Sequence, residues 1–219
     1  MRMKNRSTHK KAVVFGNGDL SDVSRVRAHI DKDTLLIACD GGAGHILSLG
    51  LTPHVVIGDF DSISARDDRA LRHRKVEYIQ YPREKLYTDT ELGVALARKR
   101  GCREIILTGI RGTSTDHMFG NIFLLAKKEF ASLNIKIIEG KEEMMLVRKR
   151  IRIKGKIGDV VSLIAISGNA GGITTKGLFY PIVNDALSAG SARGIRNRMT
   201  SKHAEITVRK GSLLMIHSI

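Results

Sequence analysis

Short aliphatic runs that end in Gly or Asp recur through the first two thirds of the chain, and amphipathic stretches lie between them. The runs do not alternate apolar and polar residues, which is typical of strands buried on both faces of a sheet. Helical stretches between such strands predict βαβ units and a mainly parallel sheet, in a Rossmann-like α/β domain. The expected strands lie within residues 12–19, 34–42, 54–62, 76–82, 104–112 and 134–140.

Two helices are marked by their local sequence. In TDTE, Thr88 is the expected N-cap and Glu91 follows three residues later, which is the pattern of a capping box. A second helix carries an apolar stripe at helical spacing, which we expect to pack in the core, made of Phe119, Ile122, Phe123 and Ala126.

The pattern changes after Gly140, where short strand-like runs are separated by glycines. These runs predict an antiparallel β domain, with one further helix around residues 183–188. We therefore divide the chain into a flexible basic tail (residues 1–11), an α/β domain (residues 12–140) and a β-rich domain (residues 141–219).

The chain is strongly basic, with 37 Lys and Arg against 22 Asp and Glu in 219 residues and a net charge of +15. This balance favours anionic partners such as nucleotides and phosphates. Nucleic acid is the weaker expectation, because the basic residues are scattered, aromatic residues make up only 5%, and no known binding module is evident.

The lengths of the apolar runs and the number of cysteines indicate in which cellular compartment we expect the chain. No apolar run approaches the roughly 20 residues that span a bilayer, so we expect no membrane partner. Cys39 and Cys102 are too few for a disulfide framework. We expect both to be small packing residues of a reduced, cytoplasmic protein.

Aspartates follow the predicted strands. Asp40, Asp59 and Asp61 lie at the C-terminal ends of strands, and Asp89 opens the helix after the fourth strand. These ends share one edge of a parallel sheet, so we expect the four carboxylates to converge. Converging carboxylates repel one another unless a cation neutralises them. Mg²⁺ takes oxygen ligands and leaves positions for phosphates, so the sequence predicts a divalent-metal site for nucleotide-dependent phosphoryl transfer.

Each of these features has a second interpretation. An isolated aspartate at a strand end is often only a cap. The Asp59 and Asp61 pair also suits phosphatases with an aspartate nucleophile and sugar-nucleotide transferases. Asp116 suits a plain N-cap, with His117 a surface histidine. The GNGD turn at residues 16–19 is either an ordinary strand-to-helix turn or a phosphate cradle at a helix N-terminus.

Four segments, in order and spacing, resemble the thiamine pyrophosphokinase (thiamine diphosphokinase) family. The likeness extends from about residue 12 to the end of the chain. The segments are DGGAGHILSLGLTPHVVIGDFDSIS (40–64), YPREKLYTDTELGVALA (81–97), TGIRGTSTDHMFGNIFLL (108–125) and TTKGLFYPI (174–182).

The resemblance implies an α/β catalytic domain that binds ATP and Mg²⁺ at residues 12–140. A β-sandwich-like domain for thiamine binding and dimerisation follows at residues 141–219. It also implies a homodimer with thiamine bound where the subunits meet. The implied reaction is a Mg²⁺-dependent attack of the thiamine hydroxyl on the β-phosphorus of ATP, which makes thiamine diphosphate and AMP.

The resemblance also implies site residues. The metal ligands would be Asp40, Asp59, Asp61 and Asp89, with Asp59, Asp61 and Asp89 also catalytic. The ATP site would be lined by Asn17, Gly18, Lys85, Thr88, Gly112, Asp116 and His117. The thiamine side would be approached by Thr175, Gly177, Leu178 and Asn197.

Three positions depart from the family pattern. Leu86 stands where an aspartate is usual, Ser114 where an arginine is common, and Arg196 where a serine is usual. A protein that only binds a nucleotide or thiamine diphosphate, and a pyrophosphokinase with an altered acceptor, therefore stay open as alternatives. The arginines that could replace the lost cation are Arg83, Arg111, Arg193 and Arg198.

Overall fold

The computed structural model describes residues 9–20, 22–112 and 114–219. The chain forms two compact units, residues 1–140 (unit 1) and residues 141–219 (unit 2). The tail prediction falls mostly on residues 1–8, outside the described residues, and the first strand already begins at Lys11.

Unit 1 is built on a parallel sheet with the strand order β6-β5-β1-β2-β3-β4. This confirms the mainly parallel α/β prediction. The strands are β1 (Lys11–Phe15), β2 (Thr34–Cys39), β3 (Val55–Gly58), β4 (Glu77–Gln80), β5 (Glu104–Thr108) and β6 (Asn134–Glu139).

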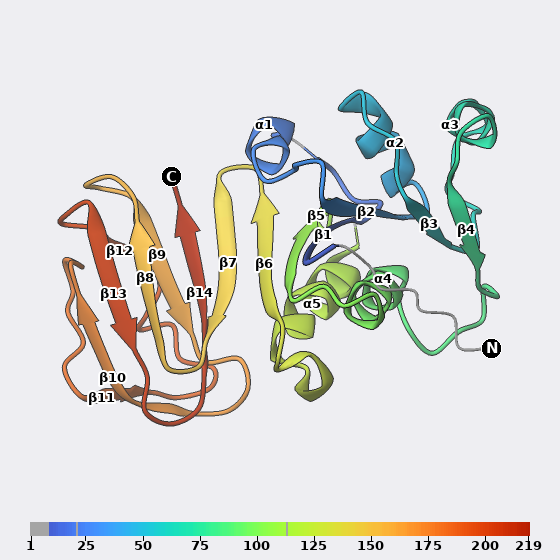
Figure 1. Cartoon of the computed structure of the whole chain (residues 1–219). Helices are drawn as coiled ribbons and strands as arrows, with labels where there is room; N and C mark the ends of the chain where they lie inside the picture. Colours follow the sequence, from blue (N-terminus) through green and yellow to red (C-terminus); the bar gives the residue numbers. More distant parts are fainter. Residues whose placement is uncertain (1–8, 21, 113) are drawn as a thin grey trace. The chain divides into compact units, whose positions relative to one another are not determined.

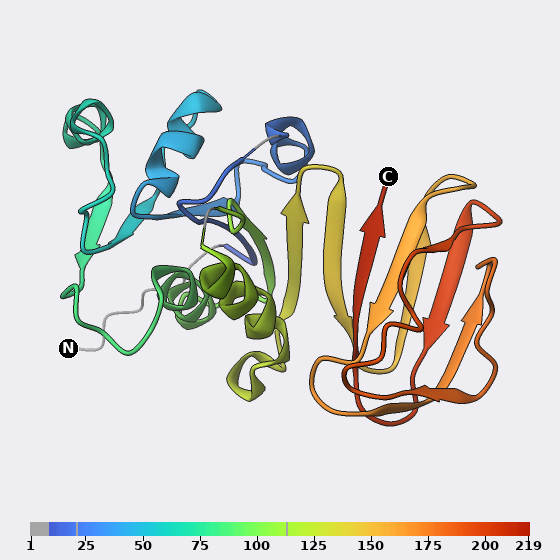
Figure 2. The same ribbon diagram turned by 180° about the vertical axis from the view of Figure 1, so that it is seen from behind.

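Helices cover both faces of this sheet. In Figures 1 and 2, α1, α2 and α3 lie on one face and α4 and α5 on the other. The helices are α1 (Val23–Arg27), α2 (Gly42–Ser48), α3 (Ala65–Arg72), α4 (Asp89–Lys99) and α5 (Thr115–Phe123), followed by the 3-10 turns η1 (Leu124–Ala126) and η2 (Lys128–Phe130).

Both faces of the sheet pack closely against these helices. Val13 and Phe15 of β1 are fully buried in a cluster with residues of α1, α2 and α3. On the opposite face, a Cβ at Gly93 of α4 would lie 2.8 Å from Val14 and 3.0 Å from the Cys39 Sγ. Glycine at this position therefore lets α4 approach the sheet closely.

Unit 2 is a sandwich of two antiparallel sheets. One has the order β12-β9-β14-β7 and the other β11-β10-β13-β8, and their apolar side chains meet in one core. The antiparallel β prediction is thereby confirmed. The strands are β7 (Glu142–Val147), β8 (Arg150–Lys154), β9 (Val160–Ile164), β10 (Ala170–Lys176), β11 (Asp185–Leu187), β12 (Asn197–Arg198), β13 (His203–Thr207) and β14 (Leu213–Ser218).

Three local predictions are wrong. Residues 185–187 form β11, which pairs with β10, instead of a helix over 183–188. Strand β4 is the edge of its sheet and mostly exposed, not buried on both faces. The α5 stripe is not core packing, because Phe119 and Phe123 are 51% and 49% exposed.

The capping prediction at α4 is confirmed at its N-cap. The Thr88 hydroxyl accepts a hydrogen bond from the Glu91 amide at 3.2 Å. The Glu91 carboxylate does not complete the box, because it pairs with Lys127.

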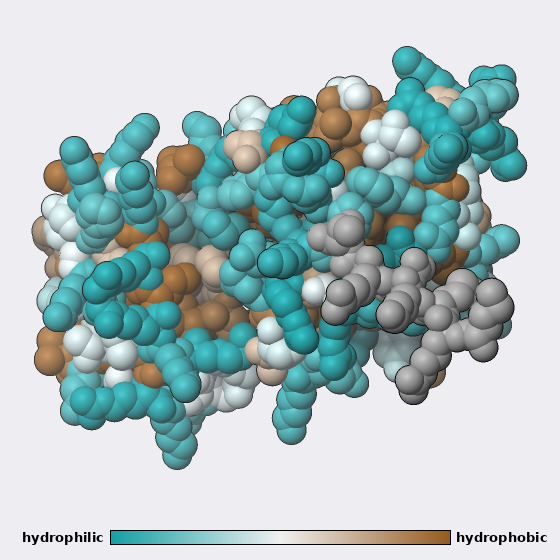
Figure 3. Space-filling model, in the orientation of Figure 1, coloured by the Kyte–Doolittle hydropathy of each residue, from teal (hydrophilic) through white to brown (hydrophobic). Residues whose placement is uncertain are grey.

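Hydrophobic residues reach the surface of the molecule in several places. Figure 3 shows hydrophobic residues between hydrophilic ones over both units on this face. Across residues 9–20, 22–112 and 114–219, no helix combines the length and the apolar character needed to cross a bilayer.

Candidate active site

A cavity of about 550 Å³ opens in unit 1, at the carboxyl ends of the parallel strands. Segments that follow all of β1 to β5 contribute to its walls, as expected where ligands bind an open α/β sheet. Its lining comprises Asn17, Gly18, Cys39, Asp40, Asp59, Asp61, Ser62, Arg83, residues 85–90, Gly109, Ile110, Gly112, Ser114, His117 and Asn121.

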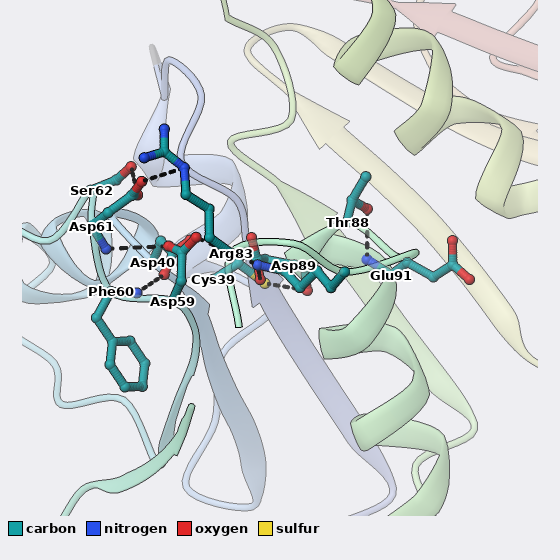
Figure 4. A network of polar contacts seen from close by, with 11 residues as sticks. Cys39, Asp40, Asp59, Phe60, Asp61, Ser62, Arg83, Thr88, Asp89 and Glu91 are labelled. Atoms are coloured by element: carbon teal, nitrogen blue, oxygen red, sulfur yellow. Dashed lines mark hydrogen bonds and ion pairs between the residues drawn. The ribbon is translucent and has the colours of Figure 1, made fainter. Parts of the chain in front are cut away.

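Three of the predicted metal ligands meet in this cavity. One carboxylate oxygen from each of Asp40, Asp59 and Asp61 lies within 4.8 Å of the other two. In Figure 4 the carboxyl groups of Asp40 and Asp59 point toward one another, and that of Asp61 points toward Ser62 and Arg83. A set of three carboxylates suits a hard divalent cation.

Asp40 is held rigidly. It is 7% exposed and has a φ of 46°, in the left-handed region that aspartate tolerates better than most residues. Its Oδ1 accepts a hydrogen bond from the Phe60 amide at 2.9 Å. Burial raises the pKa of Asp40 to about 7; the Phe60 amide opposes this rise, and the charges of Asp89 and Asp59 add to it.

Lys85 neutralises part of the acidic cluster. Its Nζ lies 3.1 Å from Asp89 Oδ1 and 3.7 Å from Asp59 Oδ2. Burial by itself lowers the pKa of Lys85, but Asp89 and Asp59 outweigh it and leave this pKa raised. The Asp61 amide, then Lys85, lowers the pKa of Asp59. Lys85 therefore stays charged and Asp59 ionised near neutral pH.

The structure places most of the predicted ATP residues in the same cavity. Asp116 is the exception, because it is not a lining residue. Its exposed carboxylate accepts hydrogen bonds from the Ser114 hydroxyl and the His117 amide. The six that line the cavity are Asn17, Gly18, Lys85, Thr88, Gly112 and His117.

The GNGD turn packs against the neighbouring loop. The Gly18 amide donates to the Gly109 carbonyl at 2.7 Å, and the Asp19 amide donates to the Arg111 carbonyl at 2.5 Å. A Cβ at Gly18 would lie 1.8 Å from the Arg111 carbonyl oxygen. These two amides are therefore occupied within the chain, and Gly18 is explained by the close approach of two loops.

Several lining residues were not anticipated from the sequence. Ser62 directly follows the aspartate pair, and Thr90 follows Asp89. Asn121 is 6% exposed, and its Oδ1 forms no hydrogen bond with any described residue. Its position four residues after His117 placed it on the same face of α5, which was the available signal.

The predicted thiamine residues lie in unit 2 and have partners inside it. Thr175 Oγ1 accepts from the Ile182 amide at 2.9 Å, and Leu178 is 5% exposed. Asn197 Oδ1 accepts from the Tyr180 amide at 2.9 Å, and its Nδ2 donates to the Tyr180 carbonyl at 2.7 Å. A Cβ at Gly177 would lie 2.3 Å from the His203 carbonyl oxygen.

These four residues therefore shape the turn between β10 and β11. The rings of Phe179 and Tyr180 are exposed on that turn and pack edge to face, 4.8 Å apart. The Arg198 guanidinium lies 5.1 Å from the centre of the Phe179 ring.

Two family models cover most of the chain. The model described as "Thiamin pyrophosphokinase, catalytic domain" matches residues 26–137, and that described as "Thiamin pyrophosphokinase, vitamin B1 binding domain" matches residues 148–213. The chain belongs to the thiamine pyrophosphokinase family. The family resemblance and the enzyme class that it implied are thereby confirmed.

Relatives of the family match over nearly the whole chain. The thiamine pyrophosphokinase of Bacillus subtilis (strain 168) is 28% identical over 207 residues, covering 94% of this chain and 97% of the relative. The crystal structure of the B. subtilis protein has a TM-score of 0.86 at 26% identity, covering 95% of this chain and 99% of that one. The thiamin pyrophosphokinase of Geobacillus thermodenitrificans has a TM-score of 0.82 at 27% identity, covering 95% and 97%.

The departures from the family pattern lie in different surroundings. Leu86 lines the cavity and is 94% exposed, and Ser114 lines it at the start of α5. Arg196 has a φ of 58°, and its amide donates to Ser162 Oγ at 3.0 Å.

Two of the arginines that could replace the lost cation also differ in their surroundings. Arg83 lines the cavity, 3.9 Å from Asp61. Arg193 pairs instead with Asp185 at 2.6 Å.

Proposed function

We propose that this chain is a Mg²⁺-dependent thiamine pyrophosphokinase, a transferase that moves pyrophosphate from ATP to thiamine. Family membership supports thiamine diphosphate synthesis by pyrophosphoryl transfer. The observation that carries the finer proposal is the convergence of Asp40, Asp59 and Asp61 in one cavity that also contains Lys85.

The donor set suits Mg²⁺. The ligand atoms are carboxylate oxygens, and their mutual repulsion is strong enough to help raise the pKa of Asp40. Asp40, Asp59 and Asp61 would hold the ion, with Asp89 beside them. A bound Mg²⁺ would neutralise charge on the phosphates and polarise the phosphoryl oxygens.

The remaining groups act on the substrates themselves. Lys85 and Arg83 supply positive charge that would hold the triphosphate in line for attack. The thiamine hydroxyl would attack the β-phosphorus, and the bond between that phosphorus and the α-phosphate oxygen would break to release AMP. The hydroxyl proton would pass to a carboxylate oxygen of Asp59 or Asp61 and then to solvent.

Thiamine would bind at the subunit interface of a homodimer. The exposed apolar side chains of unit 2 support this proposal, because an obligate dimer buries such surface. They include Phe179, Tyr180, Val183 and Ile195. Phe179 and Tyr180 provide the aromatic surface that would contact thiamine in a chain without tryptophan.

A reducing, cytoplasmic setting is part of the proposal. Cys39 and Cys102 are both free and buried. Burial, together with Asp89 and Asp40, raises the pKa of the Cys39 thiol, which keeps it protonated and unreactive.

The decisive experiment measures AMP formed from ATP and Mg²⁺ with and without thiamine, and identifies thiamine diphosphate by mass. We expect thiamine-dependent AMP from the wild type. Asp59→Asn and Asp61→Asn should each lower kcat at least 100-fold while the circular dichroism spectrum is unchanged. Asp33→Asn, an exposed aspartate outside the cavity, is the matched control and should keep full activity.

The alternatives make different predictions for the same assay. Full activity in both cavity variants would reject the proposed site. Binding of ATP without any AMP would favour a catalytically reduced nucleotide-binding protein. AMP formation with a hydroxylated acceptor other than thiamine would favour an altered acceptor, and Arg196→Ser is then the first reversion to make.

A further inference from the structure

Glu139 is a buried acidic residue that the proposed reaction does not use. It is the last residue of β6 and is 2% exposed. Burial raises the pKa of its carboxyl group to about 7. The charged groups near it are Arg111, which lowers this pKa, and Asp19, which raises it. A buried acid that keeps such an unfavourable position needs a structural reason.

The carboxyl group of Glu139 holds the loop that follows β5. Its Oε1 accepts a hydrogen bond from the Ile110 amide at 2.8 Å, and the neighbouring Gly109 amide also lowers the pKa of the carboxyl group. Gly109 has a φ of +63°, so the chain turns sharply at the point where the two amides face Glu139. Without Glu139, the Ile110 amide would lose its acceptor in a buried position.

The same loop forms one wall of the cavity. Gly109, Ile110 and Gly112 are lining residues. The carbonyl groups of Gly109 and Arg111 accept hydrogen bonds from the GNGD turn, which also lines the cavity. The loop is therefore held on two sides, by the GNGD turn through its carbonyl groups and by Glu139 through its amides.

We propose that Glu139 is a positioning residue of the nucleotide cavity, which holds residues 109–112 in the form that lines it. The inference rests on the proposed function in one respect, which is that ATP is the ligand bound against residues 109–112. Glu139 does not touch the substrate. It acts through the backbone of the loop, and a displacement of about 1 Å at a substrate-positioning group can cost up to about 100-fold in rate.

The test compares three variants of the full chain with a matched control. Glu139→Gln keeps an acceptor of the same shape, whereas Glu139→Leu removes it and Glu139→Asp withdraws it by one methylene. Thr108→Val is the control, because it breaks the neighbouring buried hydrogen bond from Thr108 Oγ1 to the Ile138 carbonyl, 2.9 Å long, and leaves the loop amides alone. Thr108 is not a lining residue of the cavity.

Two readouts separate positioning from simple destabilisation. Hydrogen exchange of the Gly109 and Ile110 amides in the ligand-free protein should become at least 10-fold faster in Glu139→Leu and stay near wild type in Glu139→Gln. The KM for ATP should rise about 10- to 100-fold in Glu139→Leu, with the KM for thiamine unchanged. Glu139→Asp should lie between these limits and covers the case in which the leucine variant does not fold.

Equal effects of Glu139→Asp and Thr108→Val on the KM for ATP would overturn the proposal, because Glu139 would then be only structural. Unchanged exchange at Gly109 and Ile110 in the folded Glu139 variants would overturn it too. If the wild type does not bind ATP, the proposed function fails, while the exchange measurement still tests the hold of Glu139 on the loop.

Discussion

The acidic cluster depends on a glycine as much as on its aspartates. A Cβ at Gly58 would lie 2.0 Å from Asp40 Oδ1, and Gly58 itself has a φ of +146°. The Phe60 amide, which holds Asp40, belongs to a residue with a φ of +68°. The GDFDS segment therefore combines two unusual backbone conformations in order to seat one carboxylate.

The buried carboxyl group of Asp40 should make stability depend on pH in the absence of metal. Its folded-state pKa of about 7 exceeds the reference value of 3.8, so the folded state binds more protons between these values. The free energy of unfolding should therefore fall as pH rises from about 4 to about 7. Thermal unfolding in EDTA across this range checks the slope.

Asp40→Asn is the variant that isolates this contribution, since asparagine does not titrate. It should make the free energy of unfolding depend less steeply on pH. The pH dependence that Glu139 contributes should remain, because the pKa of Glu139 is also raised. Added Mg²⁺ should raise the unfolding temperature of the wild type more at pH 7.5 than at pH 5.5, because the ion binds the ionised carboxylate. An identical Mg²⁺ effect at both pH values would contradict the site.

At the scale of elements, α4 and α5 begin at the cavity and differ in how well their sequences predicted them. The N-cap of α4 follows from a local pattern and is present in the structure. Which face of α5 is buried depends on what packs against the helix. The Phe119 and Phe123 rings, predicted to lie in the core, are exposed and stack on each other with centroids 6.4 Å apart. Helical spacing reveals an apolar face but does not say what covers it.

Two N-caps allow stability and binding to be separated. Thr88 caps α4 and lines the cavity, whereas Ser64 caps α3 and does not line it. Thr88→Ala and Ser64→Ala should each lower the free energy of unfolding by about 1 kcal/mol. Only Thr88→Ala should also raise the KM for ATP, by about 3- to 10-fold, since one hydrogen bond contributes about 1 kcal/mol. Equal KM values in the two variants would remove Thr88 from the ATP site.

At the scale of the whole molecule, each unit has its own core and its own exposed apolar side chains. In unit 1 these include Phe119 and Phe123, and in unit 2 they include Phe179 and Val183. Single exposed apolar residues are ordinary, but a dimer that binds thiamine at its interface needs a surface of this kind.

We expect the wild type to sediment as a dimer. The double variant Phe179→Ser, Val183→Ser should raise the dimer dissociation constant at least 10-fold, because each side chain contributes about 1.5–3 kcal/mol when buried. The matched double variant Phe119→Ser, Phe123→Ser, with similarly exposed side chains, should leave the dimer intact. The proposed interface is rejected if the wild type is a monomer or if only the α5 variant dissociates.

The sequence by itself determined the layered α/β unit, the antiparallel unit and the meeting of Asp40, Asp59 and Asp61. The physical reason is that periodicity is local, and the carboxyl ends of parallel strands share an edge whatever their order. Only the tertiary structure decided that residues 185–187 pair with β10, that β4 is an edge, and that the Asp116 carboxylate bonds to Ser114 and His117 without lining the cavity. It also decided that Glu139 holds the cavity loop, because strand pairing, burial and a shifted pKa depend on residues far apart in the chain.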